Sequence, residues 1–145
     1  MKRNKIVLTI CVIIMFIIFV EITVYMSESI KISELNNMYK DINILENKIA
    51  LYYLDYGNLP IIQEKRIEFE ENSVNSNDNE IYYEIDLNKL ENLNLFFGDK
   101  KIGEKDIYII NEQSHTIYYL AGYEYKGEMI YTKNLDYKYV DLEKY

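Results

Sequence analysis

The hydrophobic positions change their spacing along this chain, and each spacing predicts a different kind of element. From residue 6 to residue 26 the sequence is almost continuously apolar, and Glu21 is its one charged residue. A helix over this stretch would measure about 31 Å, close to the thickness of the hydrocarbon core of a bilayer. We therefore predict a transmembrane helix at 6–26.

Apolar residues then recur at alternating intervals of three and four, which is typical of one face of an amphipathic helix. This stripe consists of Leu35, Met38, Ile42, Leu45, Ile49, Tyr52 and Tyr56. The residues between them are mostly charged or amide side chains. Among these, Asp41 and Glu46 lie near Lys40 and Lys48, where we expect them to give only weak support on the surface.

The amphipathic pattern predicts a helix over residues 27–57. Gly57 suits the left-handed position after a last helical turn, and Pro60 follows soon after it. The stripe could pair with a second helix in a coiled coil or cover a sheet of its own chain. Its aromatic lower end favours the sheet.

Shorter elements are predicted beyond the helix. We expect a strand or irregular segment to about residue 69, a polar loop at 71–80, a strand to about residue 85 and a short helix at 87–93. Asp86 or Asn88 would cap that short helix.

The last third of the chain is β-like. Runs rich in β-branched and aromatic residues occupy 107–110, 116–121 and 128–132, and short polar joins connect them. Such runs predict an antiparallel meander, and the closing residues 133–145 are read as an edge strand and a tail. The predicted fold class is α+β, with the long N-terminal helix packed on a small antiparallel sheet.

The chain is basic before the apolar run and acidic after it. Lys2, Arg3 and Lys5 precede it, which leaves 13 basic against 24 acidic residues in the remainder, a net charge of −11. The basic leader at 1–5 is expected to stay in the cytoplasm and to place residues 58–145 outside as an extracytoplasmic β-rich domain. The acidic exterior argues against nucleic acid as a partner.

A cleaved signal peptide is the alternative to a retained single-pass anchor in the cell membrane. The apolar run is too long for a signal peptide, and no small-x-small cleavage site follows it, so a retained anchor is favoured. Within that anchor Glu21 has two interpretations. It pairs with a basic or amino group of a neighbouring subunit, or it lies one turn from the outer interface and reaches water.

No residue pattern in the chain predicts catalysis. A Gly-rich phosphate loop, a nucleophile elbow and an ordered Ser/His/Asp set are all missing from the sequence, and His115 falls in a predicted hairpin turn beside Ser114. One Cys and one His argue against a metal centre. Residues 75–80 are oxygen-rich but lack the Gly of a calcium loop, so a polar loop is favoured. We expect no enzyme activity, cofactor or metal.

The end of the long helix carries the sharpest motif, Tyr52-Tyr53-Leu54-Asp55-Tyr56-Gly57-Asn58-Leu59-Pro60. This motif resembles the Y-x-L-D-x-G-x-[YL]-P signature of type IV pilins and type II secretion pseudopilins. Within it, Tyr52, Asp55, Gly57 and Pro60 are the matching positions. The order of basic leader, apolar helix, amphipathic continuation and antiparallel sheet is similar to that family over nearly the whole chain.

The leader departs from the family pattern. Family members are processed after a Gly, and a Glu stands five residues into the mature chain, whereas residues 1–5 contain no Gly and Glu21 comes much later. The resemblance implies a structural subunit of a pilus, competence or secretion assembly, with membrane lipid and other pilin-like or membrane assembly subunits as partners. The alternative is a free-standing membrane-anchored domain that binds an extracellular ligand.

Overall fold

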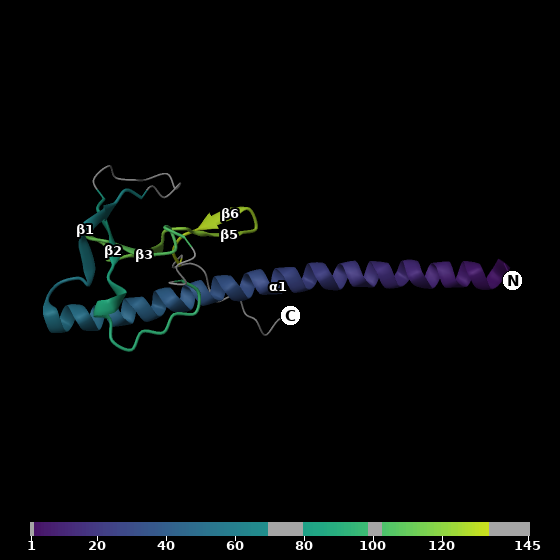
Figure 1. The fold of residues 1–145 in the computed structure, drawn as a ribbon, viewed down its shortest axis with the longest axis horizontal. Coiled ribbons are helices and arrows are strands. Elements are labelled where there is room, and N and C mark those ends of the chain that lie inside the picture. Colours follow the sequence, from purple (N-terminus) through teal and green to yellow (C-terminus); the bar gives the residue numbers. More distant parts are fainter. Residues whose placement is uncertain (1, 70–79, 99–102, 134–145) are drawn as a thin grey trace. The chain divides into compact units, whose positions relative to one another are not determined.

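The computed structural model describes residues 2–69, 80–98 and 103–133. Contacts within the chain group it into two compact units, Met1–Glu34 and Leu35–Tyr145. One long helix, α1 (Lys2–Tyr56), contributes residues to both units (Figure 1).

The first unit contains the apolar part of α1. Its large hydrophobic side chains from Ile6 to Ile30 are between 46% and 69% exposed. The most apolar stretch of this helix has a mean hydropathy of 2.9 and none of it is buried. By its length and composition the helix is a candidate membrane span, and the predicted span at 6–26 lies within it.

The second unit contains the sheet. Four antiparallel strands lie in the order β1-β2-β3-β4, and a separate two-stranded hairpin follows. Their bounds are β1 Ile61–Ile67, β2 Tyr82–Ile85, β3 Tyr108–Asn111, β4 Ile117–Tyr119, β5 Tyr123–Tyr125 and β6 Glu128–Ile130. A single turn of 3₁₀ helix, η1 (Leu87–Lys89), follows β2.

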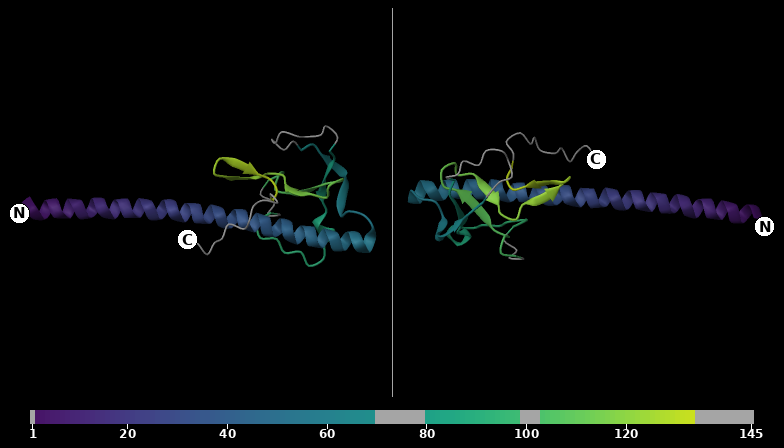
Figure 2. Two further views of the ribbon diagram at one scale, coloured as in Figure 1. Left: turned by 180° about the vertical axis from the view of Figure 1, so that it is seen from behind. Right: turned by 90° about the horizontal axis from the view of Figure 1, so that it is seen from above.

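One face of the sheet packs on the amphipathic part of α1, as the views in Figure 2 show. The stripe residues Leu35, Met38, Ile42, Leu45 and Ile49 are at most 5% exposed. From the sheet, the pairs Tyr108–Tyr119 and Ile110–Ile117 share a face, and the Tyr108 hydroxyl reaches α1 at Asp41. The predicted α+β fold, with the helix on an antiparallel sheet, is confirmed. Since these five residues are buried within their own chain, they are not available for a coiled coil, whereas the aromatic end of the stripe is half-buried at Tyr52 and exposed at Tyr56.

The opposite face of the sheet is covered by aromatic rings. Phe69 makes ring contacts with Tyr82, Tyr118 and Tyr131 at centroid distances of 5.2–5.4 Å. Beneath this cover, Ile109 is fully buried. The small sheet therefore has apolar packing on both faces, and the rings of the second face account for part of the high tyrosine content.

The short helix predicted at 87–93 is wrong in length. Only Leu87–Lys89 form a helical turn, and Asp86 caps it by accepting a hydrogen bond from the Asn88 N–H at 3.2 Å. The turn ends because Leu90 adopts an extended backbone, and Asn92 then takes a left-handed conformation with φ of 52°. Leu90 is nevertheless buried.

The polar join predicted between the runs at 116–121 and 128–132 also needs correction, because it contains strand β5. Tyr125 pairs with Glu128, which leaves Lys126 and Gly127 as a two-residue turn with φ of 53° and 83°. Positive φ at both positions is the geometry that matches the twist of a tight hairpin. Tyr123–Tyr125 of this join are therefore strand, and Lys126 and Gly127 form its turn.

Some predicted segments lie outside the described residues. These are the polar loop at 71–80, apart from Glu80, and the closing stretch beyond residue 133. Residues 75–79, which were weighed for calcium, are among them. The predicted strands at 61–69, 81–85, 107–110, 116–121 and 128–132 each overlap an observed strand, and β3 extends one residue further than predicted, to Asn111.

The end of α1 has the predicted geometry. The helix stops at Tyr56, Gly57 has φ of +71°, and its N–H donates to the Tyr53 carbonyl at 2.8 Å. We expect Gly57→Ala to destabilise the fold by about 1 kcal/mol, because a Cβ disfavours this left-handed backbone although it would meet no neighbouring atom. Gly57→Asn should cost less than Gly57→Ala. Urea unfolding of the two variants checks this order.

Candidate functional site

The residues singled out in the sequence lie in different settings. Glu21 is an exposed position of α1 within the first unit. In the second unit, Tyr52 is half-buried with its ring 4.5 Å from that of Tyr56, and Asp55 is exposed. Pro60 is fully buried, and its carbonyl accepts from the Asp86 N–H at 2.8 Å. The motif at the helix end therefore joins α1 to β1 and β2 and brings no reactive groups together.

A cluster around Asp41 was missed in the sequence. Asp41 is fully buried within the apolar stripe of α1. Its carboxylate accepts hydrogen bonds from the backbone N–H groups of Phe96, Phe97 and Gly98 at 2.7, 2.8 and 3.0 Å, and from the Tyr108 hydroxyl at 2.9 Å. We call these five residues the Asp41 cluster. The expectation that Asp41 only supports the surface is wrong.

The geometry of the Asp41 cluster explains how a carboxylate is tolerated in the core. A buried charge is costly unless hydrogen bonds replace its water. Three donors come from the backbone of one segment and a fourth from strand β3, so both carboxylate oxygens are satisfied. The cluster thus joins the helix, the 94–98 segment and the sheet at one point.

One signal in the sequence could have revealed Asp41. On a helix, residues three and four apart lie on the same face. Asp41 follows Met38 by three positions and precedes Leu45 by four, and both are stripe residues. A carboxylate flanked in this way lies at the edge of the buried face. Its donors could not be found from the sequence, because three are backbone groups 55 to 57 residues away and the fourth is the hydroxyl of Tyr108 on strand β3.

Three buried tyrosines donate to carboxylates. Besides Tyr108, the hydroxyl of Tyr119 donates to Asp106 at 2.9 Å and that of Tyr82 donates to Glu80. Burial is the main cause that raises the pKa of each phenol above its usual value of 10, and the partner carboxylate adds to it. These hydroxyls therefore remain proton donors at neutral pH.

We expect the fold to lose stability in alkali. When the pKa of a group is higher in the folded state than in the unfolded state, its stabilisation is complete below the unfolded pKa and is lost as the pH rises above it. For Tyr82, Tyr108 and Tyr119 this loss begins near pH 10. Urea midpoints at pH 8 and pH 11 measure it.

Tyrosine variants separate this effect from general alkaline damage. Tyr108→Phe should lower the overall stability at pH 8 but reduce its further loss between pH 8 and pH 11. Tyr56→Phe is the matched control, because Tyr56 is 65% exposed and its variant should follow the wild type at both pH values. Equal pH dependence in all three proteins would contradict the prediction.

The flanks of α1 carry further polar contacts. Lys133 Nζ donates to Asn43 Oδ1 at 2.6 Å and pairs with Glu46, and Lys48 Nζ donates to the Glu91 carbonyl at 2.8 Å. Since the side chains of Lys133 and Glu46 are 30% and 40% exposed, solvent weakens this ion pair. These contacts attach later parts of the second unit to α1. Because they are partly exposed, we expect each to stabilise the fold less than the buried hydrogen bonds of the Asp41 cluster do.

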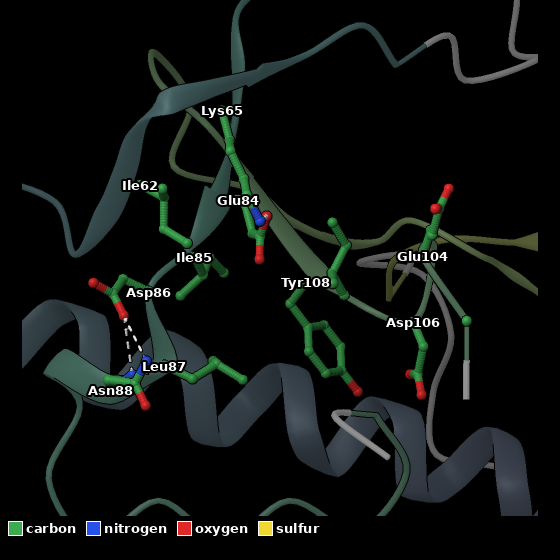
Figure 3. Close-up of a pocket in the computed structure, with 12 residues that line it drawn as sticks. Ile62, Lys65, Glu84, Ile85, Asp86, Leu87, Asn88, Glu104, Asp106 and Tyr108 are labelled. Carbon is green, nitrogen blue, oxygen red and sulfur yellow. Dashed lines mark hydrogen bonds and ion pairs between the residues drawn. The ribbon is translucent and has the colours of Figure 1, made fainter. Parts of the chain in front are cut away.

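A cavity of about 390 Å³ opens beside β1 and β2 (Figure 3). Three of the four carboxylates in its lining, those of Glu84, Asp86 and Asp106, have structural partners. Glu84 pairs with Lys65 at 2.7 Å, and Asp86 caps η1 through Asn88, toward which it points in Figure 3. Asp106 accepts from Tyr119. The arrangement therefore gives these groups a role in the fold rather than in holding a ligand.

No protein-family model, curated protein or solved structure matches this chain. The resemblance to the pilin and pseudopilin family therefore stays a prediction from the sequence.

The turn between β3 and β4 holds the residues considered for nucleophilic chemistry. His115 is exposed in a left-handed conformation with φ of 57°, and its ring lies 5.7 Å from that of Tyr53. The Ser114 hydroxyl donates to Thr116 Oγ1 at 2.9 Å.

Among the residues that the structure describes, no group of three His, Cys, Asp or Glu side chains is placed to hold a metal ion.

Proposed function

We propose that this protein is a non-enzymatic, pilin-like subunit that is anchored in the cell membrane by a single helix. It would serve as an accessory or minor component of a pilus, competence or secretion assembly. Its basic N-terminus would lie in the cytoplasm and its β-rich domain outside. Membrane lipid and other pilin-like or membrane assembly subunits are the partners that this proposal requires.

One observation carries the proposal: the apolar side chains of α1 are exposed in its N-terminal part and buried against the sheet in its C-terminal part. Between Ile6 and Ile30 its large apolar side chains are exposed, whereas from Leu35 to Ile49 its apolar stripe is buried under the sheet. Exposed apolar surface of this extent needs lipid or another protein to cover it. A helix that supplies both an anchor and the core of its own sheet suits a subunit that assembles through its anchors.

Glu21 supplies the test of assembly. Ionisable side chains within a span usually have a partner or a function. In a Cys11→Ser background, Glu21→Cys should crosslink to a neighbouring subunit in membranes of the native host. Thr23→Cys is the matched control, because two residues rotate a helix by about 200° and place it on the other side at nearly the same depth.

The outcomes separate the two candidate functions. Strong crosslinking at Glu21→Cys and weak crosslinking at Thr23→Cys supports an assembled subunit. Failure of both variants to crosslink, with the intact chain in the membrane fraction, would replace the proposal with a free-standing anchored binder. Recovery of the intact chain in the cytosol, or of a chain shortened at the apolar run, would contradict the anchor itself.

A further inference from the structure

The buried stripe of α1 does not define one position of the sheet along the helix. Its spacing alternates between three and four, so a slip by one turn places each stripe residue where its neighbour was. Leu35, Met38, Ile42, Leu45 and Ile49 would become Met38, Ile42, Leu45, Ile49 and Tyr52. Four of these five exchanges are between Leu, Met and Ile, and cores tolerate exchanges of such similar volume well; only Tyr52 in the place of Ile49 adds bulk.

The connection between helix and sheet also permits a slip. Leu54 and Tyr56 are 80% and 65% exposed, and Asp55 is exposed as well. Unwinding this last turn would lengthen the link to β1 without uncovering the core, which a slip of the sheet away from Tyr56 requires, whereas a slip toward Tyr56 requires no longer link. One turn of helix corresponds to about 5 Å along its axis.

Asp41 is the one buried residue of this helix face that breaks the repeat. A slip by one turn toward either end would bring Ile44 or Leu45, or Asn37 or Met38, to its place. None of these side chains is a carboxylate. The slip would leave backbone N–H groups facing a residue that cannot satisfy all of them, which is costly in a buried site.

The donors of Asp41 are themselves held firmly to the sheet. A Cβ added to Gly98 would lie 2.3 Å from the Tyr108 ring, so the backbone there packs directly against a side chain of β3. Phe97, the next donor, makes ring contacts with Tyr119 and Tyr123 at 5.2 and 5.6 Å. Gly98 and Phe97 therefore pack against strand residues, whereas the Phe96 ring lies 5.9 Å from Lys40 Nζ of α1.

We propose that Asp41 sets the register of the sheet on α1. The apolar stripe holds the sheet against the helix, but it does not determine at which turn of the helix the sheet packs. A single buried polar group is known to fix register in packed helices. This role is independent of the function proposed above, since it concerns only residues of the second unit.

Spin labels at two exposed positions, Asn47→Cys and Gln113→Cys, measure the register in the full chain in detergent, with Cys11→Ser as background. The otherwise unaltered protein should give one narrow distance. Asp41→Leu should give two or more distances, because registers that differ by one turn become similar in free energy. Asp41→Leu with Ile44→Asp should give one narrow distance again, shifted by up to about 5 Å, since the carboxylate has moved by one turn.

Leu45→Ala is the control for loss of stability alone, because it removes buried stripe volume but leaves Asp41 in place. It should keep the single, unshifted distance. An unshifted narrow distance in Asp41→Leu would overturn the proposal, and so would an unshifted distance in the double variant. Loss of the sheet in both Asp41 variants would also overturn it, since the carboxylate would then be needed for folding and not for register.

Discussion

Gly98→Ala is expected to destabilise the second unit by about 3–5 kcal/mol, because its new methyl group has no room. The added Cβ would lie 2.3 Å from the Tyr108 ring, and Gly98 is buried in the core. Overpacking of this kind costs about 1–3 kcal/mol. The shift would also pull the Gly98 N–H away from Asp41, and a hydrogen bond to a charged acceptor contributes about 1.5–3 kcal/mol.

Gly103→Ala is the matched control for this prediction. Gly103 is exposed, and a Cβ built there meets no atom within 4 Å. Its variant should lie within about 0.5 kcal/mol of the wild type, as surface substitutions usually do. Urea unfolding followed by tyrosine circular dichroism measures both. Similar stability of the two alanine variants would show that Tyr108 moves aside easily and would refute the close packing.

The elements of the fold were largely predictable because they rest on local patterns. The stripe from Leu35 to Ile49 is a repeat of three and four, and its burial follows from that repeat. Gly57 ends the helix because its own backbone favours the left-handed conformation. In each case the physical cause lies within one turn of the residue concerned.

What could not be predicted depends on groups far apart in the chain. Its charged neighbours Lys40 and Glu46 suggest that Asp41 is a surface residue. In the folded chain it is buried, because the backbone N–H groups of residues 96–98 donate to its carboxylate. Likewise, the sequence predicted a polar join where β5 lies. The pairing of Tyr125 with Glu128 across the turn at Lys126–Gly127 places the hairpin, and this pairing is not visible in the hydrophobic pattern. Backbone donors leave no mark in a sequence pattern.

Asp41→Ala is expected to cost about 3–5 kcal/mol, because it removes the acceptor of four hydrogen bonds at once. Each buried donor that loses its partner costs about 1–3 kcal/mol, and these costs overlap since the donors share one acceptor. Asp55→Ala on the same helix is the matched control. Asp55 is exposed, so its variant should differ little from the wild type in a urea unfolding experiment.

A double-mutant cycle with Tyr108→Phe shows whether the loss comes from the hydrogen bonds or from the cavity. In the wild type, Tyr108→Phe removes a buried hydrogen bond to a charged carboxylate, at a cost of about 1.5–3 kcal/mol. In the Asp41→Ala background the same change should cost almost nothing or stabilise the fold, because the hydroxyl has already lost its acceptor. Additive costs would contradict this account, since residues that share a buried hydrogen bond are coupled. Coupling would show that the carboxylate joins helix and sheet through its donors and not through packing alone.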